Sequence, residues 1–126
     1  MPTGERHRFP RSVRLRRGTE IRAALRTGRR VRTRYFDLYV APAPAGRLRV
    51  ALVVPRYSRS IVARNRVKRR LREALRLEFL PRCRGRLASD IVVRARLEAY
   101  DAPLAALAAE FVRCARRLCS EHSSSG

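Results

Sequence analysis

The residues best suited to chemistry in this chain are cations crowded into one short segment. Residues 56–76 hold nine Lys and Arg side chains against a single acid, Glu73, which gives a net charge of +8. Surface helices usually interleave both signs, because like charges three or four positions apart repel each other. Such crowding is unfavourable unless an anion relieves it, so the segment indicates a surface that binds phosphate groups.

Apolar spacing predicts that residues 61–79 of this segment form a helix. Ser58 or Ser60 can cap its first turn, and Pro81 and Gly85 are expected to end it. A rigid, capped element would hold the cations in fixed positions, which favours an RNA- or DNA-binding surface over an ordinary solvated helix face.

On a helical wheel the segment separates into an apolar stripe and a cationic face. The expected buried stripe consists of Val67, Leu71, Ala74 and Leu75. The opposite side carries Asn65, Arg66, Lys68, Arg69, Arg72 and Arg76, with Arg64 and Arg70 at the borders.

The chain that must position this face is long enough for one compact domain. Its 126 residues are 45% hydrophobic, which supports a single RNA-binding domain spanning residues 1–126. Residues 1–12 are polar and basic without apolar periodicity, so we expect a mobile N-terminal arm, and residues 120–126 are assigned to a C-terminal tail. The N-terminus lacks the apolar h-region of a secretory signal, and no apolar run reaches the length of a membrane span.

The remaining elements are predicted in the order α-β-β-α-β-α, an α+β arrangement. A first short helix is expected to be capped by Thr19 and stopped by Gly28. Strands are expected at residues 35–40, 48–54 and 91–96. The second strand is apolar on both faces, as a central strand would be.

A final helix is expected to open at Asp101 and Pro103. Its apolar face comprises Leu104, Leu107, Ala108, Phe111, Ala115 and Leu118. Three or more strands with helices on one face would make a two-layer α/β sandwich.

The cysteines and histidines do not indicate a metal site or a catalytic site. Cys83, Cys114 and Cys119 are odd in number and unlike zinc ligands in spacing, and the two histidines lie near the chain ends. We expect the cysteines to be reduced and to act as small hydrophobes in a reducing cytoplasm. No Cys/His pair, carboxylate cluster or Gly-rich phosphate loop is evident, so no catalytic residue is assigned to the protein itself.

The overall charge points to a polyanionic partner. The chain carries 31 basic and 10 acidic residues, a net +21, and Lys68 is its only Lys. Arg presents a planar fork of donors that matches phosphate oxygens in pairs. A charge this large destabilises a compact monomer by self-repulsion, so a polyanionic partner is the simplest reason to tolerate it. A protein that binds a membrane surface would instead have an amphipathic helix that packs in no core.

The cationic segment also carries a resemblance to a known family. From residue 64 to residue 74 it reads RNRVKRRLREA, which resembles the Arg-Asn-Arg signature of the bacterial ribonuclease P protein subunit, RNRxKRxxR. The matching residues are Arg64, Asn65, Arg66, Lys68, Arg69 and Arg72. The flanks similar to the family are residues 9–11, 14–15, 48–52 and 90–96, so the resemblance covers about residues 8 to 120.

The resemblance implies a protein subunit of ribonuclease P, the endoribonuclease that removes the 5′ leader from precursor tRNA. In that family the RNA subunit carries the chemistry with Mg²⁺, so Mg²⁺ is expected to act through the RNA and not to be bound by the protein alone. The implied partners are the catalytic RNA and the precursor tRNA 5′ leader, with no membrane and no obligate protein partner. The implied fold has a mostly antiparallel sheet of three to four strands packed by helices and a left-handed β-α-β crossover, against the usual right-handed rule.

The resemblance also assigns roles to residues. The six matching residues are expected to face the catalytic RNA. Further RNA contacts are expected at Arg56, Arg59, Arg76, Arg11 and Arg14. The leader is expected in a cleft between the first helix and the sheet, at Tyr39, Phe36, Ile21 and Leu25.

Within that cleft, alternation along a strand directs Phe36 and Tyr39 to opposite faces, which favours Tyr39 for the cleft and Phe36 for the core. Ile21 and Leu25 depart from the family, which often has Phe at both positions. The loop at residues 59–62 departs as well, since Arg-Ser-Ile-Val replaces a Gly-Asn-Ala-Val-like stretch.

Two alternatives share the charge and the size. One is a ribosomal or other structural RNA-binding protein without a role in tRNA processing. The other is a DNA-binding regulator, which would present base-reading side chains and usually dimer symmetry. The motif and its flanks favour the ribonuclease P protein over both.

Overall fold

The computed structural model describes the chain from residue 11 to residue 124. The expected N-terminal arm, residues 1–12, therefore lies outside the described residues except for its last two. Those two begin a short 3-10 turn, η2 (Arg11–Val13), whose Val13 is buried in the main core.

A four-stranded mixed sheet forms the centre of the molecule. Its strands are β1 (Arg29–Arg32), β2 (Phe36–Pro42), β3 (Arg49–Val53) and β4 (Ser89–Ala95). Their order in the sheet is β1-β2-β4-β3, with antiparallel β1–β2 and β2–β4 pairs and a parallel β3–β4 pair. Because β3 and β4 are parallel neighbours, the helices between them form the expected β-α-β crossover.

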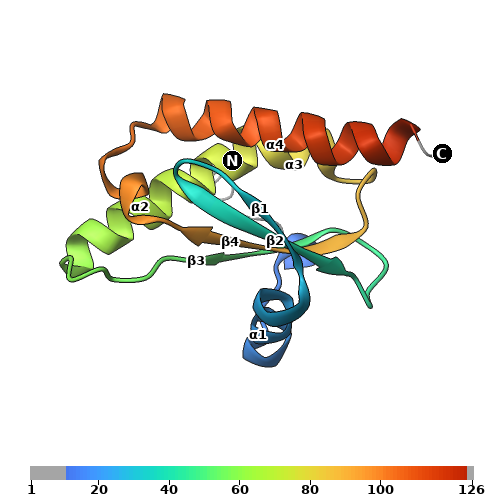
Figure 1. Ribbon diagram of the computed structural model, residues 1–126, viewed down its shortest axis with the longest axis horizontal. Helices are drawn as coiled ribbons and strands as arrows, with labels where there is room; N and C mark the ends of the chain where they lie inside the picture. Colours follow the sequence, from blue (N-terminus) through green and yellow to red (C-terminus); the bar gives the residue numbers. More distant parts are fainter. Residues whose placement is uncertain (1–10, 125–126) are drawn as a thin grey trace, which may run out of the picture.

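Helices cover both faces of this sheet. They are α1 (Gly18–Thr27), α2 (Ile61–Ala74), the π-helical turn η3 (Leu75–Phe79), α3 (Leu80–Cys83), the 3-10 turn η4 (Leu97–Asp101) and α4 (Leu104–Ser124). Figure 1 shows α2, α3 and α4 together along one side of the sheet and α1 on the opposite side. The expectation that all helices lie on one face was therefore wrong for α1.

The two faces bury separate apolar clusters. The main core joins the sheet to α2, η3, α3 and α4, and its fully buried side chains include Phe36, Phe79 and Phe111. The predicted apolar stripe of α2 and the predicted apolar face of α4 both lie in or against this core. A smaller cluster on the other face packs Leu15 and Ala24 against the sheet.

The smaller cluster explains why β3 was predicted to be a central strand. Its two apolar faces predicted a central strand, but β3 is an edge strand of the sheet. Ala51 on one face packs in the small cluster with Leu15, and Val50 on the other face packs in the main core. The N-terminal segment covers this edge through a parallel bridge between Arg14 and Val50.

Strand β1 was not predicted, because its sequence shows no alternation of apolar residues. Three of its four residues are Arg, and only Val31 is buried. Its formation depends on pairing with β2, in the register Val31 with Leu38.

Several element ends differ from those expected. Helix α1 begins at Gly18 with Arg17 as N-cap, so Thr19 already lies in the first turn and does not cap it. Pro81 does not end the long helix, because a new helical turn starts at Leu80 after the π turn. Pro81 thus lies in the first turn of α3, where a residue needs no backbone N–H for the helix. The helical run ends at Cys83, followed by Gly85 with a φ of +84°.

Helix α4 also extends farther than expected. It runs to Ser124, through most of the segment that the sequence assigned to a tail at residues 120–126. Within residues 11–124, none of the helices combines the length and the apolar character that crossing a bilayer demands.

The prediction of three reduced cysteines was wrong for two of them. Cys83 at the end of α3 and Cys119 on α4 form a disulfide, with their Cα atoms 5.7 Å apart. The two residues are 36 positions apart, and they meet because α3 and α4 pack side by side. Cys114 is free and buried, and burial, followed by the charge of Glu110, raises the pKa of its thiol to about 12.

Candidate nucleic-acid interface

Helix α2 is held firmly at both its start and its inner face. The Ser60 hydroxyl accepts a hydrogen bond from the backbone N–H of Ala63 at 3.1 Å, which confirms the predicted cap. The predicted stripe of Val67, Leu71, Ala74 and Leu75 is completely buried. The outer face of the helix is therefore fixed relative to the sheet.

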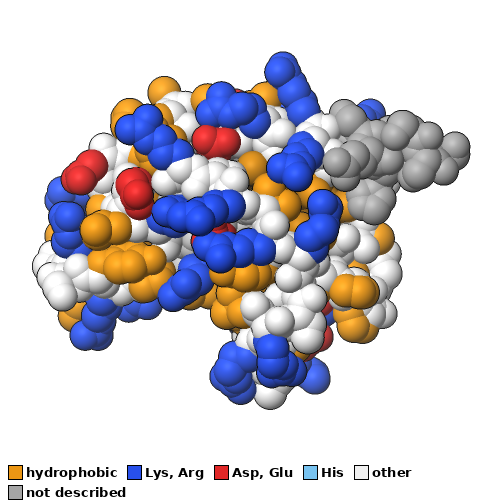
Figure 2. Space-filling view, in the orientation of Figure 1, with side chains coloured by type: hydrophobic (Ala, Val, Ile, Leu, Met, Phe, Trp, Pro, Cys, Tyr) orange, Lys and Arg blue, Asp and Glu red, His pale blue; other side chains and the backbone are white. Residues whose placement is uncertain are grey.

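The six motif residues lie on or beside that outer face. Asn65, Arg66 and Arg69 are exposed, whereas Arg64, Lys68 and Arg72 are half-buried. Figure 2 shows Lys and Arg side chains spread over the visible face of the molecule, with few acidic groups between them.

The border residues of the face are tied to the fold. Arg64 donates from Nε to the Val54 carbonyl at 2.8 Å, and Arg70 donates from Nη2 to the Tyr100 carbonyl at 2.9 Å. Arg64 thus has one donor committed to the backbone and its terminal nitrogens left for a ligand.

Acidic side chains neutralise little of the positive charge on this face. Among the residues that the structure describes, none of the six motif residues forms an ion pair with an acid. Arg76, which the sequence placed on the same face, is instead paired with Glu73. Arg76 is therefore less available to RNA than its position on the wheel predicted.

Arg14 approaches the same face from the N-terminal segment. Burial, followed by the positive charge of Arg14, lowers the pKa of the Arg72 guanidinium. Two half-buried cations held near each other gain from an anion placed between them. Arg11 is exposed on the preceding turn.

The loop before α2 is pinned to the rest of the molecule although it departs from the family. Tyr57 and Ser58 have φ values of 49° and 62°, and the Tyr57 hydroxyl donates to the Ala95 carbonyl at 2.9 Å. Arg56 and Arg59 are exposed, and the Arg59 guanidinium lies 5.3 Å from the centre of the Tyr100 ring. Both arginines are thus presented beside the start of α2.

The opposite face of the sheet holds three of the four predicted cleft residues. Tyr39, Ile21 and Leu25 are partly buried and pack against the small apolar cluster under α1. Phe36 was wrongly included in the cleft list: it is fully buried in the main core and stacks on Phe111 with ring centres 4.3 Å apart. Strand alternation predicted that Phe36 and Tyr39 lie on opposite faces of the sheet, and this prediction is confirmed.

An ionic clamp that the sequence did not reveal fastens α1 to this face of the sheet. Arg49 on β3 donates to both carboxylate oxygens of Asp90 at 2.9 and 2.8 Å, and to Glu20 of α1 at 2.9 Å. The hydrogen bonds that Arg49 donates to Asp90 and to Glu20 raise the pKa of its guanidinium. The three residues are far apart in sequence, so only the folded sheet brings them together.

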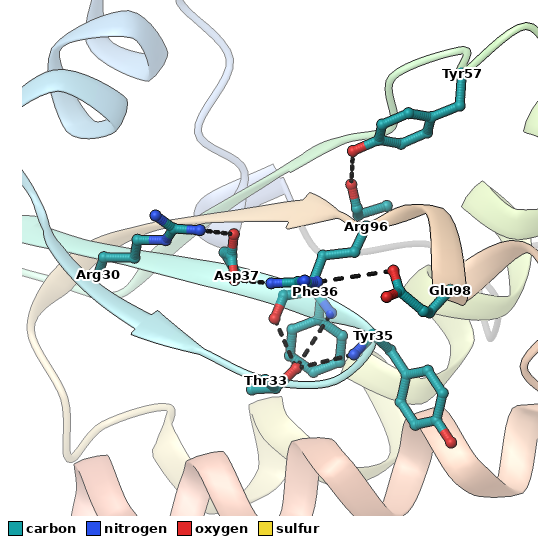
Figure 3. Close-up of polar contacts among 9 residues, drawn as sticks. Arg30, Thr33, Tyr35, Phe36, Asp37, Tyr57, Arg96 and Glu98 are labelled. Atoms are coloured by element: carbon teal, nitrogen blue, oxygen red, sulfur yellow. Dashed lines mark hydrogen bonds and ion pairs between the residues drawn. The ribbon is translucent and has the colours of Figure 1, made fainter.

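A second unpredicted cluster lies around Asp37, on the same side of β2 as Tyr39. Figure 3 shows Arg30 and Arg96 directed at this carboxylate from either side. Arg30 lies 2.8 Å from Asp37 Oδ2, and Arg96 lies 3.6 Å from Oδ1. Asp37 is 4% exposed, so this face of the sheet has a buried carboxylate beneath the cations Arg30 and Arg96.

Within the described residues, no three His, Cys, Asp or Glu side chains gather in a way that could hold a metal ion. The arrangement that the structure does present is a rigid cationic helix face on one side and a partly buried Tyr39 beside α1 on the other. Such surfaces suit phosphate groups and single-stranded bases, respectively.

Comparison with known proteins gives consistent matches. The sequence profile of the family described as Ribonuclease P matches residues 9–119. The ribonuclease P protein component of Acidothermus cellulolyticus is 42% identical over 122 residues, covering 94% of this chain and 98% of the relative. That of Desulfovibrio desulfuricans is 40% identical over 119 residues, covering 90% of this chain and 88% of the relative.

Solved structures match the fold. The RNase P protein of Staphylococcus aureus superposes with a TM-score of 0.69 at 24% identity, covering 85% of this chain and 97% of the other. The RNase P protein of Thermotoga maritima gives a TM-score of 0.66 at 23% identity, covering 82% and 96%. Both share the α+β architecture described above.

Proposed function

Since this chain belongs to the ribonuclease P protein family, we propose that it binds the RNA subunit of that enzyme through the face around Arg64 and assists removal of the 5′ leader from precursor tRNA. Its family makes it the protein component of an endoribonuclease and implies association with ribonuclease P RNA. The alternatives of a ribosomal protein or a DNA-binding regulator are left without support.

The observation that carries the proposed docking face is its unpaired charge. Lys68, Arg69 and Arg72 sit on a rigid helix without an acidic partner among the described residues. Each phosphate that they neutralise would release counterions and add salt-dependent affinity. Arg64, Asn65 and Arg66 continue the same face toward the start of α2.

In this proposal the protein positions RNA and does not cut it. The RNA subunit would carry out the cleavage with Mg²⁺ bound to that RNA. We expect the enzyme to act in the cytoplasm. The side chains of α2 would neutralise closely spaced phosphates, which reduces their mutual repulsion and favours compact RNA. A folded RNA has its divalent-ion sites already formed, so those sites would fill at lower Mg²⁺. No residue of this chain is assigned a bond-breaking role.

The 5′ leader is proposed to lie along the cleft between α1 and the sheet. Tyr39 offers one aromatic surface on which a base can stack, and Ile21 and Leu25 offer apolar contact without a ring. Arg30, which is paired in register with Tyr39, places a cation beside the strand. Precursor tRNA would therefore bind this protein more tightly than mature tRNA does.

Reconstitution tests the proposal directly. Purified protein is added to a bacterial ribonuclease P RNA with precursor tRNA at low Mg²⁺, and release of the leader is measured. We expect the protein to stimulate cleavage. No stimulation across a range of Mg²⁺ concentrations would refute the proposed role, and duplex DNA outcompeting the RNA at equal salt would favour a regulator.

Two variants on α2 separate binding from folding. Arg69→Ala removes an exposed cation, so it should weaken binding to the RNA and lower the salt slope by about one, without loss of stability. Arg64→Ala should weaken binding as well, and should also cost about 1 kcal/mol of unfolding free energy through the lost bond to Val54. Arg116→Ala, on the exposed side of α4, is the control.

Salt slopes from filter binding and urea unfolding curves measure these two effects. An unchanged slope for both α2 variants would show that this face does not contact the RNA.

A further inference from the structure

A second concentration of cations lies at the end of the sheet where β3 and β4 begin, far from the start of α2. Residues of the turn η2, the β2–β3 connection and the α3–β4 connection line a surface hollow there. Figure 1 shows the strands β3 and β4 whose starts define this end of the sheet. Its lining includes Ser12, Arg47, Arg84 and Arg86, above the buried side chains of Val13 and Leu48. Two separate segments of the chain thus direct arginines at one place, and the turn η2 supplies Ser12 beside them.

Ser12 fixes two of these arginines. Arg47 donates from Nε to the Ser12 carbonyl at 3.0 Å, and Arg84 donates from Nη2 to the Ser12 hydroxyl at 3.0 Å. These bonds use one donor of each guanidinium, and an Arg side chain has five. The remaining donors are held in a defined orientation and exposed to solvent.

The hollow has no acid in its lining to neutralise this charge. Among residues 11–119, Arg47, Arg84 and Arg86 form no ion pair, and the Arg86 side chain makes no hydrogen bond. Elsewhere in the same part of the chain, acids are placed against Arg30, Arg49, Arg82 and Arg113. The hollow is therefore, like the face of α2, a place where cations gather without acidic partners among the described residues.

The floor of the hollow strengthens the case for an anion. Val13 and Leu48 are buried apolar side chains, so a group bound above them is shielded on one side from water. Guanidinium–phosphate attraction increases as the local dielectric falls. Gly46 and Gly85 at the rim have open space where a Cβ would stand, so access to the hollow is free.

We propose that this hollow is a second RNA contact, in which Arg47, Arg84 and Arg86 bind backbone phosphates of a strand that also engages, or lies beside, the α2 face. Helices α2, η3 and α3 follow one another without a break, so roughly 30 Å of helix separates Arg64 from Arg84. The choice of RNA as ligand rests on the proposed function, whereas phosphate binding in the hollow does not. The contact would extend the footprint of the protein well beyond the family motif.

A phosphate titration tests the site without RNA. Backbone amide shifts are followed by NMR while inorganic phosphate is added to the full chain at constant ionic strength. We expect saturable shifts at Ser12 and at residues 84–86 in the wild type. The double variant R84A/R86A should lose them, and R116A/R117A, which removes the same charge from exposed positions of α4, should keep them.

An RNA titration tests the ligand. The slope of log affinity against log salt should fall by about one to two in R84A/R86A and stay unchanged in R116A/R117A, because each phosphate contact contributes about 0.9. Equal losses in the two double variants, or none in either, would overturn the inference. Tighter binding of polyglutamate than of RNA at equal salt would also overturn it.

The outcomes keep this inference distinct from the proposed function. If the wild type stimulates cleavage and R84A/R86A retains the full salt slope, the second contact fails and the function stands. If phosphate shifts appear at Ser12 but the wild type does not bind ribonuclease P RNA, the proposed function fails and the anion site stands. Circular dichroism of each variant verifies that the fold is retained.

Discussion

Phe36 has no exposed surface and stacks on Phe111, whose ring also packs edge-on against Phe79. Replacing Phe36 with Ala would leave a cavity among these rings and remove its transfer free energy. We expect a loss of about 3–5 kcal/mol in unfolding free energy, measured by urea denaturation. A loss below 1 kcal/mol would mean that the stacked pair does not organise the core.

Tyr39 on the same strand should behave in the opposite way. It is partly exposed beside α1, and stacking on a base is worth about 1–3 kcal/mol. Tyr39→Ala should therefore weaken the binding of precursor tRNA while binding of mature tRNA stays the same, and Tyr39→Phe should retain most of the preference. Equal weakening of both RNAs would remove Tyr39 from the leader site.

For single residues, strand alternation predicted that Phe36 and Tyr39 lie on opposite faces of the sheet, and helical periodicity predicted the buried stripe of α2. Both patterns depend on neighbours in sequence. The partners of Arg49 are Glu20 and Asp90, which come from two other elements, so no local pattern indicated them. Inclusion of Phe36 in the cleft came from the family resemblance and not from its position on the strand.

Among the elements, α1 depends on the clamp at Arg49. Arg49→Met would leave the buried carboxylate of Asp90 without its partner, and removing one member of a buried pair costs about 3–5 kcal/mol. We expect faster hydrogen exchange in α1 and weaker leader binding, with Arg49→Lys intermediate. Unchanged exchange in α1 would show that the apolar cluster alone holds that helix.

The disulfide between α3 and α4 gives a second prediction for an element. Linking residues 36 positions apart restricts the unfolded chain, which should stabilise the fold by about 2–4 kcal/mol. Reductant should lower the urea midpoint of the wild type and of Cys114→Ser. Cys83→Ser should start at the lower midpoint and not respond to reductant, and a response in that variant would contradict the assigned pairing.

Helices were predicted better than strands because their signals are local. The apolar faces of α2 and α4 and the Ser60 cap could be read directly from spacing. Strand β1 could not, since three of its four side chains are Arg and its existence depends on the β2 edge. The edge position of β3 was hidden because the N-terminal segment supplies a second apolar cover.

At the scale of the whole molecule, the two cationic stretches meet at Arg14 and Arg72, whereas α1 carries other arginines of the first stretch on the opposite side of the sheet. Residues 1–34 carry 12 Arg against two Glu, a net +10, and residues 56–76 carry +8. Burial, followed by the charge of Arg14 from the first stretch, lowers the pKa of Arg72 in the second. The sequence predicted a polyanionic partner from the sum of these charges, but the position of Arg14 became evident only in the fold, where it forms a bridge with Val50.

The high net charge of the folded protein predicts that multivalent anions stabilise it beyond simple screening. The native state concentrates +21 charges that the unfolded chain spreads out, so a multivalent anion should bind the native state preferentially. At ten times its dissociation constant, such a ligand adds about 1.4 kcal/mol. Melting temperatures in millimolar tripolyphosphate should therefore exceed those in NaCl of matched ionic strength by several degrees. R116A/R117A should retain this difference, whereas R69A combined with R84A/R86A should reduce it. Identical midpoints in the two salts would mean that the charge is merely screened and that no anion is held at a defined site.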